Sequence, residues 1–366
     1  MKVLVLSCST GGGHNSCANY IKEELKQNGI KTVFKDFYDI VNSNAKEFAS
    51  KLYLSAVGES GEVFKNLYKL GELYSKTKIK SPVYLVNKLH RKKLYDYIEK
   101  NHFNLVITTH LFPSLTLTAI NKANYPNKVH FITIATDYEP CPFMEESQPD
   151  YFVIQKGLEN KFIKKGIPKE ILLTTGIPVS SSFIKTAKSI RNKLKLKKED
   201  QVILIMLGSM GFGKVNELLE KILLLTNSKV IVVCGSNKKL YNELNQHNNP
   251  KLIVLGFVNN INDLIYSSDI VLSKPGGLSS TEIASIGKPL IHVFPIPGIE
   301  TYNVEFFKKR NMSLKGDTPE EIIKNINKIL NSDKLQKEII HNQHTYINKN
   351  SAEDLITFIT KNKTDN

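Results

Sequence analysis

Short runs of β-branched and aliphatic residues alternate with amphipathic stretches along most of the chain. Such continuous apolar runs are typical of strands buried on both faces of a parallel sheet, and the stretches between them suit crossover helices. In the first half, strands are predicted at residues 2–6, 32–36, 105–109, 130–135 and 151–154. In the second half, they are predicted at residues 202–207, 229–234, 252–255, 270–273 and 289–293. The pattern predicts an α/β protein with two doubly wound, Rossmann-like domains.

The join between the domains is predicted near the stretch GIPVSSSF, which begins at Gly176. We expect an N-terminal domain at 1–178, a linker at 179–200 and a C-terminal domain at 201–345. A final helix in 346–366 is expected to pack back on the N-terminal domain. From residue 185 to 198 the chain carries seven basic and no acidic residues, which is typical of a solvated surface between domains.

One segment, residues 46–100, breaks the α/β rhythm because it contains no convincing strand. It holds eight aromatic, twelve basic and six acidic residues. Basic residues interleaved with Tyr, Phe and Leu on helices suit a helix that lies in the membrane interface, with cations on anionic headgroups. The same composition also fits an ordinary helical insertion whose aromatics pack into the first domain, so both interpretations remain open on the residues alone.

Charge narrows the choice of partners only slightly. The 366-residue chain has 50 Lys and Arg against 35 Asp and Glu, a formal net charge of +15. Such an excess attracts nucleic acid, anionic lipid or phosphorylated substrates, but it is also produced by a lysine-rich solvated surface. The apolar runs are far shorter than the roughly 20 residues of a membrane span, so a soluble or surface-bound protein is expected.

Cysteine usage and the N-terminus favour a cytosolic location. The four cysteines, at positions 8, 17, 141 and 234, show no CxxC spacing, so we expect neither a zinc site nor a disulfide framework. The chain opens with a short strand-like run in place of a secretory signal.

The first candidate site follows the first predicted strand, where Ser9-Thr10-Gly11-Gly12-Gly13-His14 leads into a helix. Consecutive glycines let the backbone approach a ligand closely, and the helix N-terminus offers free N–H groups. His14 can accept a proton near neutral pH, or it can cap its own helix. The loop is not the GxGxxG fingerprint, which argues against a nicotinamide cofactor.

A second glycine-rich loop, Gly208–Lys214, follows the first strand of the second half. We expect the two loops, one in each domain, to face each other across an interdomain cleft, a common place for a ligand.

The most specific stretch is SKPGGLSSTEIASIGKP, which starts at Ser273. A strand ends there, glycines and hydroxyl side chains follow, and a helix begins, an arrangement that suits a diphosphate at the helix N-terminus. Glu282 can accept both hydroxyls of a ribose. The following PGIETYN, residues 297–303, offers polar side chains for sugar hydroxyls.

Taken together, GGGH, the Gly-Ser-x-Gly loop, SKPGGLSSTEIASIGKP and PGIETYN resemble glycosyltransferase family 28. ATDYEP at 135–140 and GIPVSSSF at 176–183 make the diacylglycerol branch of that family the nearest, the branch of monogalactosyldiacylglycerol synthase and the processive diacylglycerol glucosyltransferases. The resemblance spans essentially the whole chain. It implies a GT-B fold, with two Rossmann-like domains facing across a cleft, the donor on the C-terminal domain and the acceptor on the N-terminal one.

The resemblance also implies roles for individual residues. His14 and Asp137 would be the catalytic pair, with Asp137 supporting or replacing His14 as the base, and Gly12 and Gly13 would belong to the acceptor loop. Glu282 would hold the ribose, and the backbone at Phe257 and Val258 would pair with uracil. The full set of implied donor-binding residues is Ser209, Met210, Gly211, Phe257, Val258, Gly276, Gly277, Leu278, Ser279, Ser280, Thr281, Glu282, Glu300 and Asn303.

The implied function is an inverting transfer of glucose or galactose from a UDP-sugar to diacylglycerol or glycosyl-diacylglycerol. No metal and no cofactor are implied, since the UDP-sugar is a substrate. The protein would be peripheral on the cytoplasmic face of the cell membrane. Residues 46–100 would then dock on the lipid, and the charge of +15 would meet an anionic membrane and not nucleic acid.

One departure from the family pattern is Ser180, which stands where an Arg usually follows the Gly-x-Pro motif. If that Arg meets the diphosphate, Lys214 or Lys156 would have to replace its charge. Alternative functions are transfer of GlcNAc to a polyprenyl-linked or other lipid, a UDP-GlcNAc 2-epimerase, and a catalytically silent protein that binds UDP-sugar or lipid. A nucleic-acid binder is the weakest alternative, because the basic residues form no recognisable reading motif.

Overall fold

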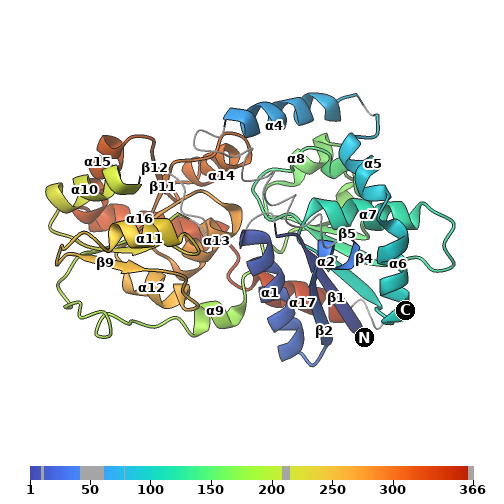
Figure 1. The fold of residues 1–366 in the computed structure, drawn as a ribbon, viewed down its shortest axis with the longest axis horizontal. Coiled ribbons are helices and arrows are strands. Elements are labelled where there is room, and N and C mark those ends of the chain that lie inside the picture. Colours follow the sequence, from blue (N-terminus) through green and yellow to red (C-terminus); the bar gives the residue numbers. More distant parts are fainter. Residues whose placement is uncertain (10–11, 42–61, 78, 208–214, 362–366) are drawn as a thin grey trace. The chain divides into compact units, whose positions relative to one another are not determined.

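The computed structural model describes residues 1–9, 12–41, 62–77, 79–207 and 215–361 (Figure 1). The chain divides into two compact units. Unit 1 comprises Met1–Ser181, Ile296–Ile299 and Asn350–Asn366, and unit 2 comprises Ser182–Pro295 and Glu300–Lys349. Each unit contains one six-stranded sheet in which all neighbours are parallel, so the predicted α/β class is confirmed.

The sheet of unit 1 has the order β2-β1-β3-β4-β5-β6. Its central strands are buried because helices cover both faces, which explains their continuous apolar runs. The strands are β1 Lys2–Ser7, β2 Lys31–Asp36, β3 Leu105–Thr108, β4 Phe131–Ile134, β5 Tyr151–Val153 and β6 Leu172–Leu173. The helices are α1 Gly12–Gln27, α2 Phe37–Val41, α4 Glu62–Ser75, α5 Pro82–Lys88, α6 Arg91–Lys100, α7 Leu111–Asn121, α8 Glu159–Lys164 and α17 Ser351–Lys361, with short 3-10 turns η1 Met144–Glu146 and η2 Lys169–Ile171.

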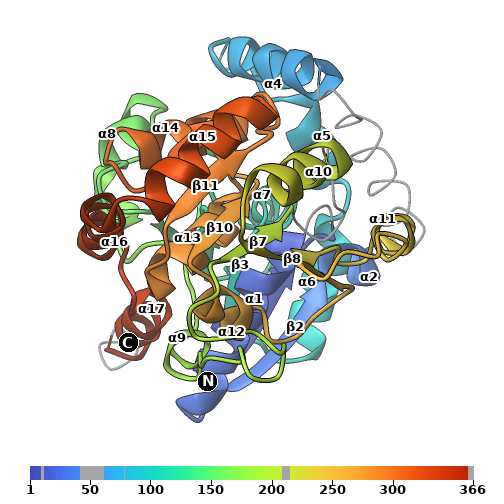
Figure 2. The ribbon, with the colours of Figure 1, turned by 90° about the vertical axis from the view of Figure 1, so that its left-hand side faces the viewer.

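The sheet of unit 2 has the order β12-β11-β10-β7-β8-β9. Helices α10 and α15 pack together on one face, and α12 packs against α13 on the other (Figure 2). The strands are β7 Val202–Met206, β8 Lys229–Val233, β9 Leu252–Leu255, β10 Ile270–Ser273, β11 Leu290–Val293 and β12 Leu314–Gly316. The helices are α9 Ser181–Lys185, which begins at the end of unit 1, α10 Val215–Leu225, α11 Lys238–Leu244, α12 Ile261–Ser267, α13 Gly277–Ile286, α14 Ile299–Lys308, α15 Pro319–Leu330 and α16 Asp333–Tyr346.

All ten predicted strands are present, and the edge strands β6 and β12 were missed. These two strands have two and three residues, and their side chains are mostly half-buried, so neither carries a long apolar run. In the segment that lacked a strand pattern, the described residues 62–100 form α4, α5 and α6. Within the described part of the chain, no helix is both long enough and apolar enough to cross a bilayer.

The order of strands reverses once in each sheet. In unit 1 the reversal lies between β1 and β3, and in unit 2 it lies between β7 and β10. At such a switch point the loops after the two strands run to opposite faces and leave a crevice at the carboxyl ends, where ligands of doubly wound sheets bind. His14 follows β1, and Lys274 to Gly277 follow β10, so both candidate sites lie at switch points.

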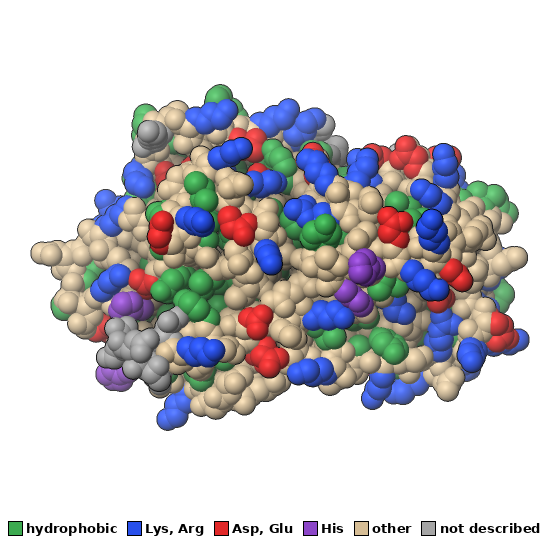
Figure 3. All heavy atoms as spheres, turned by 180° about the vertical axis from the view of Figure 1, so that it is seen from behind, with side chains coloured by type: hydrophobic (Ala, Val, Ile, Leu, Met, Phe, Trp, Pro, Cys, Tyr) green, Lys and Arg blue, Asp and Glu red, His purple; other side chains and the backbone are tan. Residues whose placement is uncertain are grey.

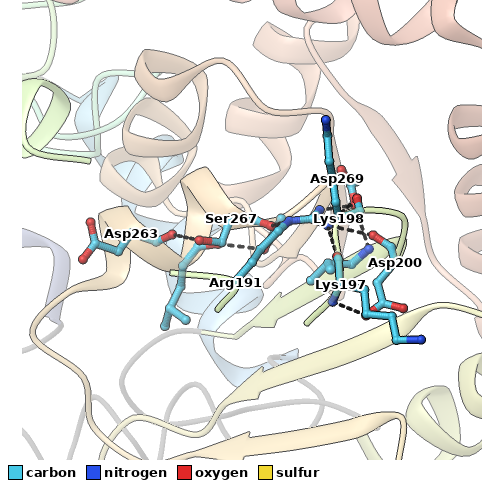
Figure 4. Close-up of polar contacts among 10 residues, drawn as sticks. Arg191, Lys197, Lys198, Asp200, Asp263, Ser267 and Asp269 are labelled. Atoms are coloured by element: carbon cyan, nitrogen blue, oxygen red, sulfur yellow. Dashed lines mark hydrogen bonds and ion pairs between the residues drawn. The ribbon is translucent and has the colours of Figure 1, made fainter. Parts of the chain in front are cut away.

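A basic residue anchors the start of unit 2. Arg191, one of the seven in the basic run, has a side chain that is only 17% exposed. Its guanidinium donates to Asp269 Oδ2 at 2.8 Å, to the Ser267 carbonyl at 2.9 Å and to the Asp200 carbonyl at 2.9 Å (Figure 4). Asp269 Oδ2 also accepts from the Val202 amide at 2.7 Å, so one ion pair joins the segment before β7 to the residue before β10. The six lysines of the run are exposed, as expected for a solvated surface.

Replacement of Arg191 by Ala should lower the free energy of unfolding of unit 2 by about 2–3 kcal/mol. The substitution removes charged hydrogen bonds and leaves the Asp269 carboxylate without the guanidinium that pairs with it. Lys193→Ala is the matched control, since Lys193 is exposed and lies in the same run. It should change stability by no more than about 0.5 kcal/mol. Urea unfolding followed by circular dichroism measures both, and equal losses in the two variants would contradict the anchoring role.

Candidate functional site

The candidate site of unit 1 forms around His14, in the first turn of α1. Gly12 and Gly13 precede it and are exposed, as a loop that approaches a ligand requires, whereas Thr10 and Gly11 lie outside the described residues. Loops from three neighbouring strands converge here, because the segments after β1, β3 and β4 all leave the same edge of the sheet. They bring together His14, Thr109 and Thr136, which are far apart in sequence.

Hydrogen bonds determine the tautomer of His14. Its Nδ1 lies 2.7 Å from the Thr109 carbonyl oxygen, which can only accept, so Nδ1 carries the hydrogen. Thr136 Oγ1 lies 3.1 Å from the same nitrogen, and Thr109 Oγ1 donates to the His14 carbonyl at 3.0 Å. The lone pair of the neutral imidazole is therefore on Nε2, the atom that can accept a proton.

The charge state of His14 depends on its surroundings. Burial lowers the pKa of His14 below its ordinary value, while the negative charge of Asp137 and the Thr109 carbonyl oppose that shift. Asp137 follows Thr136 in the loop after β4 and is half-buried. The structure thus brings the two predicted catalytic residues close enough to interact electrostatically. A partly buried, neutral imidazole beside a carboxylate is the arrangement of a general base whose imidazolium is stabilised as it forms.

His110 was not predicted as a site residue, although it lies next to His14. The two ring centroids are 4.7 Å apart in an edge-on arrangement. Nδ1 of His110 accepts from the Phe112 amide at 3.2 Å, which caps α7, so the hydrogen of this ring is on Nε2. Burial and the neighbouring His14 hold the pKa of His110 well below its ordinary value. His110 is therefore a neutral donor in the site, and its position directly after a predicted strand was the signal available in the sequence.

The candidate site of unit 2 centres on the start of α13. Gly276 is the N-cap, and it has no side chain that could accept a hydrogen bond. The first amides of α13 therefore have no capping side chain as their acceptor. Gly276 and Ser279 are partly exposed, whereas Gly277, Leu278 and Glu282 are buried. The exposed part of this turn is a helix N-terminus at the switch point of the sheet, where amides and the helix dipole favour an anion.

Two hydroxyls of the predicted donor set are engaged inside the fold. Ser280 is fully buried, and its Oγ lies 3.0 Å from His292 Nε2. Thr281 Oγ1 donates to the Gly277 carbonyl at 2.7 Å. The Ser280 contact joins α13 to β11, whereas the Thr281 bond lies within α13, and only a small fraction of either side chain is exposed.

His292, on β11, was missed by sequence reasoning because an isolated histidine in an apolar strand carries no motif. Besides Ser280, it contacts Ser313, whose Oγ lies 3.1 Å from Nδ1. Its ring meets Phe307 edge-on with centroids 5.2 Å apart. Burial lowers the pKa of His292 from 6.5 to about 3. A neutral imidazole between two serines thus connects α13 to the segment before β12.

The polar residues predicted to hold the donor sugar lie on α14. Asn303 is fully buried, and its Nδ2 donates to the Pro275 carbonyl at 2.8 Å, which fixes the loop before α13. Glu300 is half-buried in the first turn. Its charge raises the pKa of Lys274, although burial of that lysine lowers the same pKa more strongly. Lys274, another residue missing from the sequence-based set, therefore places a desolvated cation directly before the N-terminus of α13.

The remaining predicted residues fall into three groups. Phe257, whose ring is 72% exposed, and the half-buried Val258 follow β9 at the same sheet edge. Ser209, Met210 and Gly211, and also Lys214, lie outside the described residues. Ser180 is fully buried, and its hydroxyl donates to the buried Glu24 carboxylate of α1 at 3.4 Å, while Lys156 is exposed after β5.

The position of His292 predicts a pH dependence. The folded state keeps His292 neutral down to about pH 3, whereas the unfolded chain takes up a proton below about pH 6.5. This contribution to stability is complete above pH 6.5 and is lost as the pH falls toward 3, at up to about 1.4 kcal/mol per pH unit. His292→Gln should flatten the acid limb of the stability curve, measured by urea unfolding at each pH. His341→Gln, at an exposed histidine of the same unit, is the matched control, and equal slopes in wild type and His292→Gln would contradict the assignment.

Comparisons with known proteins identify the family. The model of monogalactosyldiacylglycerol (MGDG) synthase matches residues 14–179, and that of the glycosyltransferase family 28 C-terminal domain matches residues 202–357. Among relatives, the processive diacylglycerol beta-glucosyltransferase of Bacillus pumilus is 29% identical over 386 residues, with 99% of this chain and 97% of the relative covered. The enzyme of the same name from Bacillus subtilis is 29% identical over 341 residues, with 90% and 87% covered.

The solved structures agree on the fold. MurG of Acinetobacter baumannii superimposes with a TM-score of 0.61 at 13% identity, with 98% of this chain and 99% of that chain covered. The fold is therefore GT-B, built from two Rossmann-like domains, as the sequence motifs predicted. Since one family model matches each half and the relatives match nearly the whole length, the chain belongs to glycosyltransferase family 28, in the branch of the diacylglycerol glycosyltransferases.

Proposed function

We propose that this glycosyltransferase moves a hexose, glucose or galactose, from a UDP-sugar to the hydroxyl of diacylglycerol or glycosyl-diacylglycerol, with inversion at the anomeric carbon. The observation that carries the proposal is the hydrogen bond from His14 Nδ1 to the Thr109 carbonyl, which leaves Nε2 as the proton acceptor at a switch point of the sheet. The naming of the relatives as diacylglycerol glucosyltransferases supports the substrate class and favours glucose.

The reaction needs one displacement. His14 Nε2 takes the proton of the acceptor hydroxyl while its oxygen attacks the anomeric carbon, and the bond from that carbon to the UDP oxygen breaks with its electron pair. Asp137 stabilises the imidazolium that forms, because its charge already favours protonation of His14. In this scheme Gly12 and Gly13 let the acceptor approach His14 closely.

The donor is assigned to the start of α13 in unit 2. The amides at Gly276 and Gly277, with Ser279, receive the diphosphate, and Lys274 adds a positive charge directly before them. We assign to Lys274 the charge that the absent Arg at position 180 would supply, so the step runs without a metal ion. Glu282 accepts the ribose hydroxyls, Phe257 and Val258 hold uracil, and Glu300 with Asn303 defines the hexose subsite.

The acceptor is a lipid, and α4 and α5 offer the surface that meets it. Four apolar side chains of α4, Val63, Leu67, Leu70 and Leu73, are 56–63% exposed. Leu85 and Val86 of α5 and Leu89 after it are also more than half exposed. Exposed apolar side chains gathered on neighbouring helices mark a docking surface.

Charge specifies the occupant of this surface. Lys69, Lys76, Lys80 and Lys88 are exposed on and between the same two helices, and Figure 3 shows basic and hydrophobic side chains next to each other along the edge where α4 lies. Leucines that enter the acyl boundary beside lysines that meet phosphate headgroups are complementary to an anionic membrane. We therefore propose a peripheral enzyme on the cytoplasmic face of the cell membrane.

Release of UDP tests the function. UDP-glucose, UDP-galactose and UDP-GlcNAc are supplied singly, with and without vesicles that contain diacylglycerol and anionic phospholipid. Release with glucose or galactose that depends on diacylglycerol is expected. His14→Gln should lower that rate by about 10²- to 10⁴-fold with little change in UDP affinity, whereas His130→Gln, at an exposed histidine of the same unit, should turn over as wild type. Release with UDP-GlcNAc alone, or UDP binding without release on any of these lipids, would contradict the proposal.

Leucines of α4 test the docking surface. Leu67→Ser with Leu70→Ser should weaken binding to anionic vesicles by about 10- to 100-fold, because two exposed leucines that enter the acyl boundary contribute a few kcal/mol. The loss should persist in 0.5 M salt, which screens only the lysine contribution. Leu224→Ser, at a leucine of α10 that is 80% exposed, is the control and should bind as wild type. Vesicle cosedimentation measures the binding of each variant. If the double variant binds as tightly as wild type, α4 is not a docking surface.

A further inference from the structure

One segment of unit 1, residues 136–146, connects the His14 site to both helices of the proposed docking surface. At its start, Thr136 Oγ1 lies 3.1 Å from His14 Nδ1, and Asp137 follows directly. At its end, both oxygens of the buried Glu146 accept from Ser81, the N-cap of α5, through its amide at 2.7 Å and its hydroxyl at 2.8 Å. This stretch of eleven residues thus contacts the proposed base, His14, at one end and the N-cap of α5 at the other.

The middle of this segment packs against α4. Gly71 of α4 is buried against it, and a Cβ at this position would lie 3.0 Å from Pro142 Cβ and 3.5 Å from Phe143 Cε2. A contact of 3.0 Å is tighter than most Cβ contacts, so an added side chain would require Pro142 to shift by a few tenths of an ångström. The helix therefore packs closely on Pro142 and Phe143 at position 71, and a larger side chain there would press on both residues.

Phe143 is held in an unusual conformation at this contact. Its φ is +68°, in the left-handed region that a bulky side chain rarely adopts. The Phe143 amide donates to Ser75 Oγ at 3.2 Å, and its ring meets Tyr74 edge-on with centroids 6.0 Å apart. A strained backbone conformation persists only where surrounding contacts stabilise it. Here the contacts with Tyr74 and Ser75, in the last turn of α4, stabilise Phe143.

The part of the segment between Asp137 and Phe143 has little freedom to absorb a displacement. Tyr138 is fully buried, Glu139 pairs with Lys161 of α8, and the Cys141 carbonyl accepts from Lys165 at 3.1 Å. These contacts favour the transmission of a displacement of Pro142 and Phe143 toward Asp137 over its loss in a mobile loop.

We propose that the packing of α4 on Pro142 and Phe143 positions Asp137 beside His14, so that Gly71, Ser75 and Phe143 are positioning residues for the proton acceptor. The inference rests on the proposed function in assigning the base to His14 and the lipid surface to α4. It adds that a displacement of α4 also displaces Asp137 relative to His14. A membrane that holds α4 in place then also holds the catalytic carboxylate in place, which couples docking to proton transfer.

The groups that face His14 make this coupling measurable. They are the Asp137 carboxylate, which raises the pKa of His14, the Thr109 carbonyl, which does the same, the Thr136 hydroxyl, and the ring of His110. Among these four groups, only Asp137 both carries a negative charge and belongs to the segment 136–146. Displacement of Asp137 should therefore lower the pKa of His14, whereas a mere loss of folded protein would leave that pKa unchanged.

The test is a titration of His14 by NMR in protein labelled with ¹³C-histidine, with the signal assigned by its loss in His14→Gln. In Gly71→Val, the added side chain collides with Pro142, and His14 should titrate at a lower pH than in wild type. Asn66→Val, which places the same side chain at an exposed position of α4, is the matched control and should titrate as wild type. An unchanged His14 titration in folded Gly71→Val would overturn the proposal.

A milder variant decides the question if Gly71→Val does not fold. Ser75→Ala removes only the acceptor for the Phe143 amide and should shift the His14 titration in the same direction by a smaller amount. Thr77→Ala, which removes a hydroxyl that bonds within the turn after α4, is its control. No shift in Ser75→Ala would then overturn the proposal. The titration needs no substrate, so a wild type that fails to release UDP on vesicles would refute the proposed function without altering this result.

Discussion

Burial of parallel strands on both faces is the constraint on which the rest of this structure depends. The central strands β1, β3, β4, β7 and β10 are almost fully buried, so they offer no position for a polar side chain that must meet a substrate. Chemistry is confined to the loops at their carboxyl ends, and the reversal of strand order opens a crevice at one point in each sheet. His14 and the start of α13 lie at those points.

Buried polar side chains hold these loops in position. His292 connects Ser280 to Ser313, and Asn303 fixes the Pro275 carbonyl. Each is a polar group removed from water whose hydrogen bonds are made inside the unit, because an unsatisfied group there would cost stability. The turn at the start of α13 can therefore contain Gly276 and Gly277 and still be held in place, since buried hydrogen bonds beneath it fix its position.

The site of unit 1 adds an electrostatic element to this scaffold. Burial alone would leave His14 a weak base, and the neighbouring Asp137 offsets part of that effect. His110, which burial keeps neutral, adds no positive charge to the site. In the proposed reaction, a hydroxyl acceptor thus meets a neutral imidazole whose conjugate acid is stabilised. In the proposed coupling of α4 to Asp137, this balance also depends on the position of residues 136–146, on which α4 packs.

The sequence by itself determined the fold class, the family and most of the residues at the two switch points. Periodicity located ten of the twelve described strands, and glycine motifs marked the loops, because both are local properties of the chain. Edge strands β6 and β12 escaped because pairing with a neighbour, not an apolar run, defines them.

Only the tertiary structure decided which polar residues face the sites and which support them from below. Ser280 and Asn303 belong to the donor motifs, yet their side chains bond within the unit. His110 and His292 lie outside the motifs, and Lys274 lies inside one but was not assigned a role, although all three lie in or under the sites. The contact of Gly71 with Pro142 likewise joins residues about 70 positions apart. Burial, partner choice and pKa arise from contacts distant in sequence, so no local pattern encodes them.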